Sequence, residues 1–228
     1  MNITPIAYYH TKLHSKFGLP RQSGIVPELQ GMIVLEPEYS NADALRGIEG
    51  FDYLWLIWEF SLNGKEHGTW SPLVRPPLLG GNCYMGVFAT RSPFRPNPLG
   101  LSSVRLLGVE KRADRLALFV SGADLADGTP IYDIKPYVEY ADSHTGVRSG
   151  FVDSNTWNTL DVDFPEDLRS MFGAEDYTAL HKLLELDPRP QYHNDPQRIY
   201  GISFAGYDVR FSVSGNLLTV VDVIGGKF

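Results

Sequence analysis

The chain has 228 residues, a formal net charge of −7, 43% hydrophobic residues and a single cysteine, Cys83. These values predict one globular domain of ordinary size with a small appendage, and they exclude an intrachain disulfide and any site built from several cysteines. The sequence opens without a leader-like segment and contains no apolar run near about 18 residues, so we expect a soluble cytoplasmic protein with no membrane segment. The acidic balance argues against promiscuous nucleic-acid binding but leaves room for a local basic patch.

The N-terminal zone, from about residue 5 to residue 142, alternates apolar runs with glycine and proline. Such runs, five to eight residues long, predict strands in a meander or barrel rather than an alternation of strands and helices. The expected strands cover residues 31–35, 53–60, 84–89, 102–109, 116–122 and 130–138. One short helix is expected at residues 41–46, with Asn41 as its N-cap. We therefore predict a mainly β fold, with a non-Rossmann β-barrel domain over residues 1–142.

A change of composition predicts a second domain. Residues 142–153 are polar, contain glycine and hold few aliphatic side chains, as is typical of a boundary. We expect a small α+β domain over residues 150–228. Its predicted elements are a strand at 157–164, helices at 165–171 and 174–186, and strands at 199–204, 207–213 and 217–224. Pro188 ends the second helix, because proline cannot continue it.

The most informative stretch is residues 86–102, a loop with prolines at positions 93, 96 and 98. Each proline fixes its own φ and favours extended geometry in the residue before it, so Arg91, Arg95 and Asn97 lie on a stiff segment. Rigidly presented guanidinium groups suit a ligand with carboxylate or phosphate oxygens. The alternative is a proline-rich connector whose arginines are merely solvated.

Residues 73–109 contain no Asp or Glu, although the whole chain is acidic. Four arginines lie there, at positions 75, 91, 95 and 105. This distribution predicts a positive face.

Several familiar signatures are absent. No G-x-G-x-x-G follows a strand, and the sequence lacks the P-loop, H-E-x-x-H, C-x-x-C and G-x-S-x-G patterns. The six histidines are scattered without ligand spacing, so we expect no metal site.

Six pieces, in order along most of the chain, carry a resemblance. They are PRQ (20–22), LRGIEGFDYLW (45–55), VRPPLLGGN (74–82), MGVFATRSPFRPNPLGLS (85–102), DLADGTPIYDIKPY (124–137) and DPRPQY (187–192). Together they closely resemble the TrmO/TsaA/YaeB-like family, S-adenosylmethionine-dependent methyltransferases that act on N6 of N6-threonylcarbamoyladenosine at position 37 of the tRNA anticodon loop. The resemblance implies a β-barrel fold, a homodimer, S-adenosylmethionine as cofactor and tRNA as partner.

The resemblance also implies the cofactor-binding residues. They are Pro20, Arg21, Gln22, Ser61, Leu62, Arg91, Leu101, Asp124, Leu125, Ala126 and Asp127. Ser61-Leu62 stands where relatives commonly carry His-Gln. An arginine can clamp the amino-acid carboxylate of the cofactor, an aspartate can accept from its ribose hydroxyls or ammonium, and Leu101 can pack on adenine. The alternative for the two aspartates is turn capping around Gly128.

Catalysis and RNA contact are less determined. Asp133, Lys135 and Tyr137 are candidates for assisting loss of the N6 proton, although Lys135 could simply be solvated and Tyr137 could belong to the core. The candidate RNA or substrate contacts are Arg95, Asn97, Lys135, Arg189 and Tyr192. For the DPRP piece, helix termination and module packing are the alternatives to RNA contact.

Two other functions are open to the sequence. One is a non-enzymatic β-barrel module that binds S-adenosylmethionine or a nucleotide and regulates a partner. A hydrolase with Asp124 and Asp127 as paired carboxylates is weaker, because no nucleophile or metal cluster accompanies them.

Overall fold

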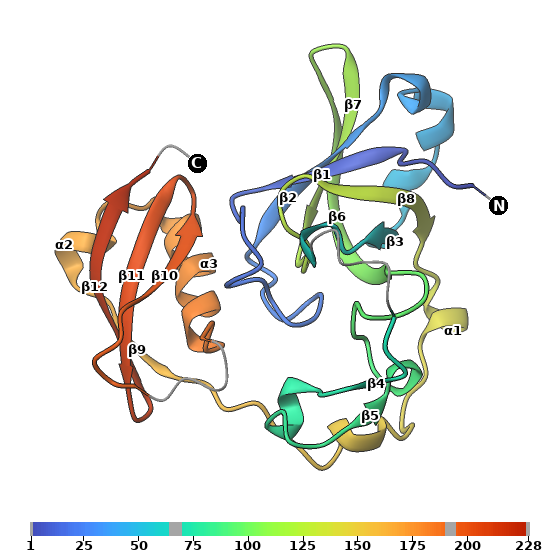
Figure 1. The fold of residues 1–228 in the computed structure, drawn as a ribbon. Coiled ribbons are helices and arrows are strands. Elements are labelled where there is room, and N and C mark those ends of the chain that lie inside the picture. The colour runs from blue at the N-terminus through green and yellow to red at the C-terminus, as the bar shows by residue number, and fades with distance from the viewer. Residues whose placement is uncertain (1, 64–69, 190–194, 227–228) are drawn as a thin grey trace.

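The structure, a computed structural model, describes residues 2–63, 70–189 and 195–226. Its N-terminal part is a closed barrel of antiparallel strands in the order β1-β2-β7-β6-β3-β8 (Figure 1). The strands are β1 (Ala7–Thr11), β2 (Gln30–Leu35), β3 (Tyr53–Glu59), β6 (Leu99–Arg112), β7 (Arg115–Ser121) and β8 (Thr129–Pro136). The predicted mainly β, non-Rossmann barrel is confirmed.

Alternation along β3 builds the barrel core. Leu54, Leu56 and Trp58 are buried, and the residues between them are more exposed. Trp58 pairs with Gly100 on β6, where an added Cβ would lie 2.2 Å from the indole Cε2. Only glycine therefore lets the strand pass this close to the Trp58 ring.

A strand and a helix near the N-terminus differ from the predictions. Strand β1 was not predicted, because only Ala7 and Tyr9 of its five residues are buried. The helix expected at 41–46 is a 3₁₀ turn, Ala42–Leu45, although Asn41 does cap it by accepting from the Asp43 N–H at 2.9 Å.

The strand predicted at 84–89 is wrong beyond its first residues. Strand β5 spans only Met85–Gly86 and pairs with β4 (Leu73–Val74), and a 3₁₀ turn, Val87–Ala89, follows. The Thr90 hydroxyl donates to the Val87 carbonyl at 2.9 Å and so stabilises the turn, while Phe88 is 73% exposed.

The C-terminal module is a four-stranded sheet, in the order β10-β11-β12-β9, whose core contains buried side chains of α3 and is packed by Leu168 of α2. A short helix, α1 (Glu139–Asp142), precedes the module. The elements of the module are β9 (Asp161–Asp163), α2 (Glu166–Arg169), α3 (Ala174–Glu185), β10 (Tyr200–Phe204), β11 (Tyr207–Ser214) and β12 (Leu217–Gly225). The strand expected at 157–164 is thus much shorter, and it runs parallel to β12. In the part of the chain that is described, no helix is both long and apolar enough to span a bilayer.

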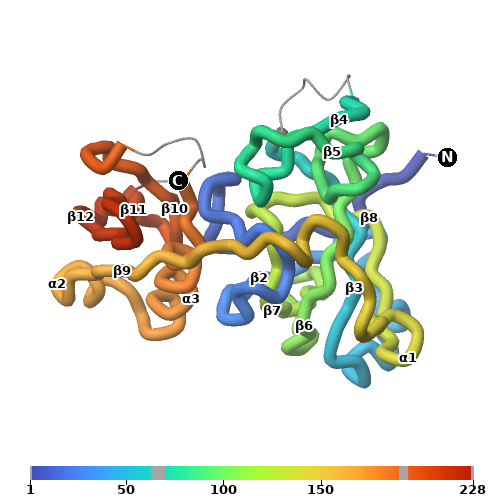
Figure 2. Tube along the Cα trace, turned by 90° about the horizontal axis from the view of Figure 1, so that it is seen from below, coloured from blue at the N-terminus to red at the C-terminus, as the bar shows by residue number. Residues whose placement is uncertain are grey.

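The segment between β1 and β2 links the two modules. It lies between the barrel and α3 (Figures 1 and 2), and Leu13, Val26 and Leu29 belong to the core of the C-terminal module. The Ala205 N–H donates to the Lys12 carbonyl at 3.1 Å. The division into domains 1–142 and 150–228 stays a prediction. Residues from this N-terminal segment nevertheless complete the C-terminal core.

Candidate functional site

A cavity of about 510 Å³ collects side chains from widely separated parts of the chain. Its volume is within the range of small-molecule sites, about 300–1,000 Å³. Nine of the predicted cofactor residues line it: Pro20, Arg21, Gln22, Ser61, Leu62, Arg91, Leu101, Asp124 and Ala126. The proline-braced loop, which contains Pro93, Pro96 and Pro98, therefore converges on one cavity with the segment before β2 and the turn after β7.

Asp124 provides the carboxylate of this cavity. Its Oδ1 accepts from the Ser102 hydroxyl at 2.5 Å, and Ser102 in turn accepts from the Trp58 indole N–H at 2.9 Å. Burial raises the pKa of Asp124, while the bond from Ser102 and the charge of Arg91 oppose that rise. A half-buried carboxylate held in one orientation is thus available to a ligand that carries hydroxyl or ammonium donors.

Arg91 provides a cation, and its position is supported from the N-terminal segment. Its Nη1 donates to the Gln22 side-chain oxygen, and the Gln22 amide donates to the Arg21 carbonyl at 2.6 Å. Arg95 also lines the cavity and donates to the carbonyls of Thr90 and Ser92 at 3.1 and 3.2 Å. These bonds add to the stiffness that the prolines impose on the loop.

Aromatic side chains of the cavity were missed by reasoning from the sequence. Trp55, Trp58 and Phe60 line it, and the Trp55 indole N–H donates to Asp142 at 2.9 Å. A tryptophan-rich strand is more often core than binding surface. The only signal was its position directly before Ser61-Leu62, within the region of the resemblance.

Two of the predicted cofactor residues do not line the cavity. Leu125 is buried in the barrel core. Asp127 accepts from the Thr11 N–H at 3.0 Å and lies 3.3 and 3.4 Å from the Nδ1 atoms of His10 and His14. The geometry of Asp127 thus favours a structural role over contact with a ligand in the cavity.

The catalytic candidates also lie outside the residues that line the cavity. Lys135 pairs with Asp133 at 2.9 Å on β8. The Tyr137 ring lies 5.7 Å from that of Trp55, so it reaches the cavity only through a lining residue. Asn97 does not line the cavity either; its carbonyl accepts from the Leu99 N–H at 2.7 Å.

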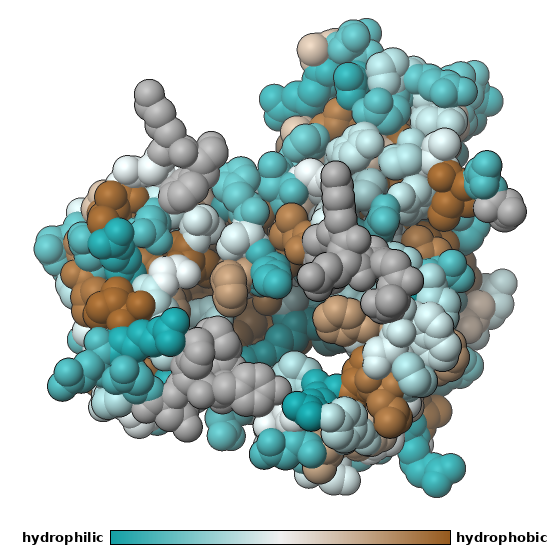
Figure 3. Space-filling model, in the orientation of Figure 1, coloured by the Kyte–Doolittle hydropathy of each residue, from teal (hydrophilic) through white to brown (hydrophobic). Residues whose placement is uncertain are grey.

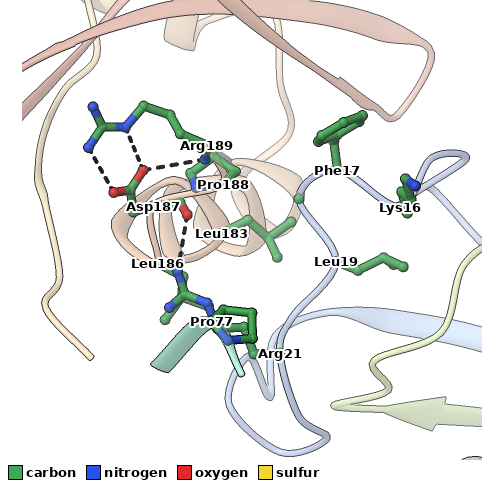
Figure 4. A pocket seen from close by; sticks show the side chains of 11 residues that line it. Lys16, Phe17, Leu19, Arg21, Pro77, Leu183, Leu186, Asp187, Pro188 and Arg189 are labelled. Carbon is green, nitrogen blue, oxygen red and sulfur yellow. Dashed lines mark hydrogen bonds and ion pairs between the residues drawn. The ribbon is translucent and has the colours of Figure 1, made fainter. Parts of the chain in front are cut away.

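A second cavity, of about 310 Å³, adjoins the first and shares Lys16, Leu19 and Arg21 with it (Figure 4). Arg189 lines it and makes a two-pronged ion pair with Asp187, with both N–O distances 2.8 Å and the arginine side chain 12% exposed. This pairing favours a structural role for Arg189 over direct contact with RNA. Tyr192 lies outside the described residues.

The space-filling view shows the surface hollowed between the C-terminal module and the barrel (Figure 3). Among the described residues, no three His, Cys, Asp or Glu side chains are grouped so as to hold a metal ion.

Both modules of the chain match models of known families. Residues 8–143 match the family model of the tRNA-methyltransferase O N-terminal domain, and residues 158–225 match that of the TrmO C-terminal domain. The tRNA (adenine(37)-N6)-methyltransferase of Escherichia coli strain K12 is 38% identical over 207 residues, which is 87% of either chain. A putative S-adenosylmethionine-dependent methyltransferase, RcsF, of Pseudomonas aeruginosa is 38% identical and covers 99% of this chain and 98% of its own. A crystal structure of TrmO from P. aeruginosa has a TM-score of 0.78 at 32% identity, covering 99% and 97% of the two chains.

Proposed function

The chain belongs to the tRNA-methyltransferase O family, and we propose that it methylates N6 of adenine 37 in tRNA with S-adenosylmethionine as methyl donor. The names of its relatives support both the reaction and the donor. We further propose that the acceptor is the threonylcarbamoyl-modified adenosine of the anticodon loop, as the resemblance to this family implies.

One observation carries this proposal: cationic, anionic and apolar groups that match the donor share one preformed cavity. Arg91 suits the amino-acid carboxylate, Asp124 suits the ribose hydroxyls or the ammonium, and Leu101 offers an apolar face for adenine. Leu101 is 58% exposed, as a residue that packs on a ligand would be before the ligand binds. The residues present therefore fit the cofactor.

When bound, S-adenosylmethionine supplies an electrophilic methyl group on a sulfonium leaving group. The protein must also hold donor and acceptor in line, keep water out and let the N6 proton leave as the N–C bond forms. The aromatic walls at Trp55, Trp58 and Phe60 serve that purpose. The carbonyl bonds of Arg95 orient its guanidinium within the cavity, where we propose that it meets the carboxylate of the modified base.

We also propose a homodimer and a cytoplasmic location, which would place the enzyme with its tRNA. The division of labour proposed here gives donor binding to the barrel domain, residues 1–142. We propose that RNA contacts residues 73–109, which hold four arginines and no acidic residue, together with the domain at 150–228.

The experiment is transfer of labelled methyl from S-adenosylmethionine to tRNA isolated from cells that lack this modification, followed by mass spectrometry of the nucleosides. We expect label in N6-methylated threonylcarbamoyladenosine. Cofactor binding without any turnover would instead favour the regulatory module.

The Arg91→Ala variant tests whether Arg91 binds the cofactor. We expect it to abolish binding in a calorimeter, because it removes the cation opposite the cofactor carboxylate. Unchanged affinity would remove Arg91 from the site.

A further inference from the structure

Arg21 is a cavity residue whose partners lie in the C-terminal half of the chain. Its Nη2 donates to the Asp187 main-chain oxygen at 3.2 Å, and its Cζ lies 3.7 Å from the centre of the Trp157 ring (Figure 4 shows the first contact). Burial lowers the pKa of this guanidinium, and Asp187 opposes the shift. The orientation of Arg21 therefore depends on groups outside the barrel.

The Asp187 carbonyl is itself held in place by an unusual local conformation. Asp187 directly follows Leu186, the C-cap residue of α3, and has a φ of 52°. Glycine usually occupies this position, because the conformation is left-handed. For residues other than glycine that conformation costs on the order of 1 kcal/mol, and Asp tolerates it best where its side chain is hydrogen-bonded locally. Arg189 offsets the cost, because its backbone N–H, at 3.3 Å, and both prongs of its guanidinium donate to the Asp187 carboxylate.

From Arg21 the contacts continue to Arg91, the cation proposed to bind the donor. The Arg21 carbonyl accepts from the Gln22 amide, and the Gln22 oxygen accepts from Arg91. Hydrogen bonds, with Asp187, Arg21 and Gln22 between them, thus link Arg189, which lies beyond the end of α3, to Arg91 on the loop that contains Pro93, Pro96 and Pro98.

We propose that Arg189 is a positioning residue for the methyl donor, acting through the Asp187 carbonyl on Arg21. This inference rests on the proposed function. Arg189 lines only the smaller cavity and does not line the donor cavity. Its removal releases the turn at Asp187, so that Arg21 loses its carbonyl acceptor and the cavity loses a fixed wall.

The test compares two ion pairs of one module. Arg189→Leu removes the pair with Asp187. Arg210→Leu is the matched control, because Arg210 pairs with Asp208 on β11 with the same two-residue spacing and a distance of 3.0 Å, and it lines neither cavity. Calorimetry with S-adenosylmethionine gives the affinity of the full chain, and circular dichroism confirms that each variant is folded.

We expect Arg189→Leu to weaken donor binding about tenfold, and Arg210→Leu to change it less than about twofold. In turnover, the KM for the donor should rise while kcat at saturating donor stays within about twofold. In an Arg21→Ala background the Arg189 substitution should have no further effect, since it acts through Arg21.

The outcomes separate this inference from the function it rests on. If the wild-type chain binds no donor, both fall. If the wild type binds and folded Arg189→Leu binds equally well, the inference alone is overturned. It is also overturned if Arg189→Leu weakens binding equally with and without Arg21.

Discussion

Replacing Asp124 with asparagine tests the chemistry of the cavity most sharply. The substitution keeps the shape of the side chain and leaves an oxygen that can accept from Ser102, but it removes the negative charge. Because partial burial raises the pKa of Asp124, the charge opposes folding at neutral pH. We therefore expect Asp124→Asn to bind the donor more weakly and yet to melt at a higher temperature without ligand.

The magnitude follows from the bonds that the carboxylate makes. A hydrogen bond to a charged group contributes about 1.5–3 kcal/mol, compared with about 1 kcal/mol for a neutral one. With one bond to a cofactor hydroxyl or ammonium lost, affinity should fall by a factor of about 10 to about 150. Calorimetry with S-adenosylmethionine measures this factor, and thermal unfolding of the ligand-free chain measures the gain in stability.

Asp127→Asn is the matched comparison, since Asp127 lies three residues away and does not line the cavity. Its affinity should stay within about threefold of wild type, because its partners are Thr11, His10 and His14. Equal affinity of Asp124→Asn and wild type would refute the reasoning. So would a loss in Asp127→Asn as large as that in Asp124→Asn.

Three other predictions concern neighbouring groups. Ser102→Ala leaves the Trp58 N–H and one Asp124 oxygen without their partner, which should lower the free energy of unfolding by about 1–3 kcal/mol in a urea titration. Donor affinity of the wild type should fall as the pH drops through the raised pKa of Asp124, because protonation removes the acceptor; a flat calorimetric profile would count against it. In the same titration, Leu180→Ala should lower the free energy of unfolding by about 2–5 kcal/mol, because Leu180 is fully buried in the C-terminal core. A smaller loss would show that neighbouring side chains move to fill the space that the leucine leaves.

The strands that were predicted correctly are those with a clear pattern of alternation or of flanking turns in their own sequence. Residues 53–59 alternate clearly, and β10, β11 and β12 are bounded by turns with glycine, so each was predicted within a residue or two. Strand β1 shows no such pattern. It exists because closure of the barrel lets it pair with both β2 and β8, and that is a property of the whole fold.

The site shows the same contrast. Arg91 and Asp124 were predicted because the motifs that contain them are long and specific. Ser102 was not predicted, since a serine in a strand normally faces solvent, and its burial becomes favourable because Trp58 and Asp124 both hydrogen-bond its hydroxyl. Trp157 was predicted to lie in a strand, but the strand begins only at Asp161. Its contact with Arg21 could not be predicted because more than a hundred residues separate the two in the sequence.

The most direct measurement is a crystal structure of the chain with S-adenosylhomocysteine, the demethylated product of the donor. The amino-acid carboxylate of the product should lie against Arg91 and its ribose or ammonium against Asp124, with adenine over Leu101. Density for the product at any other place on the chain, with this cavity empty, would contradict the account.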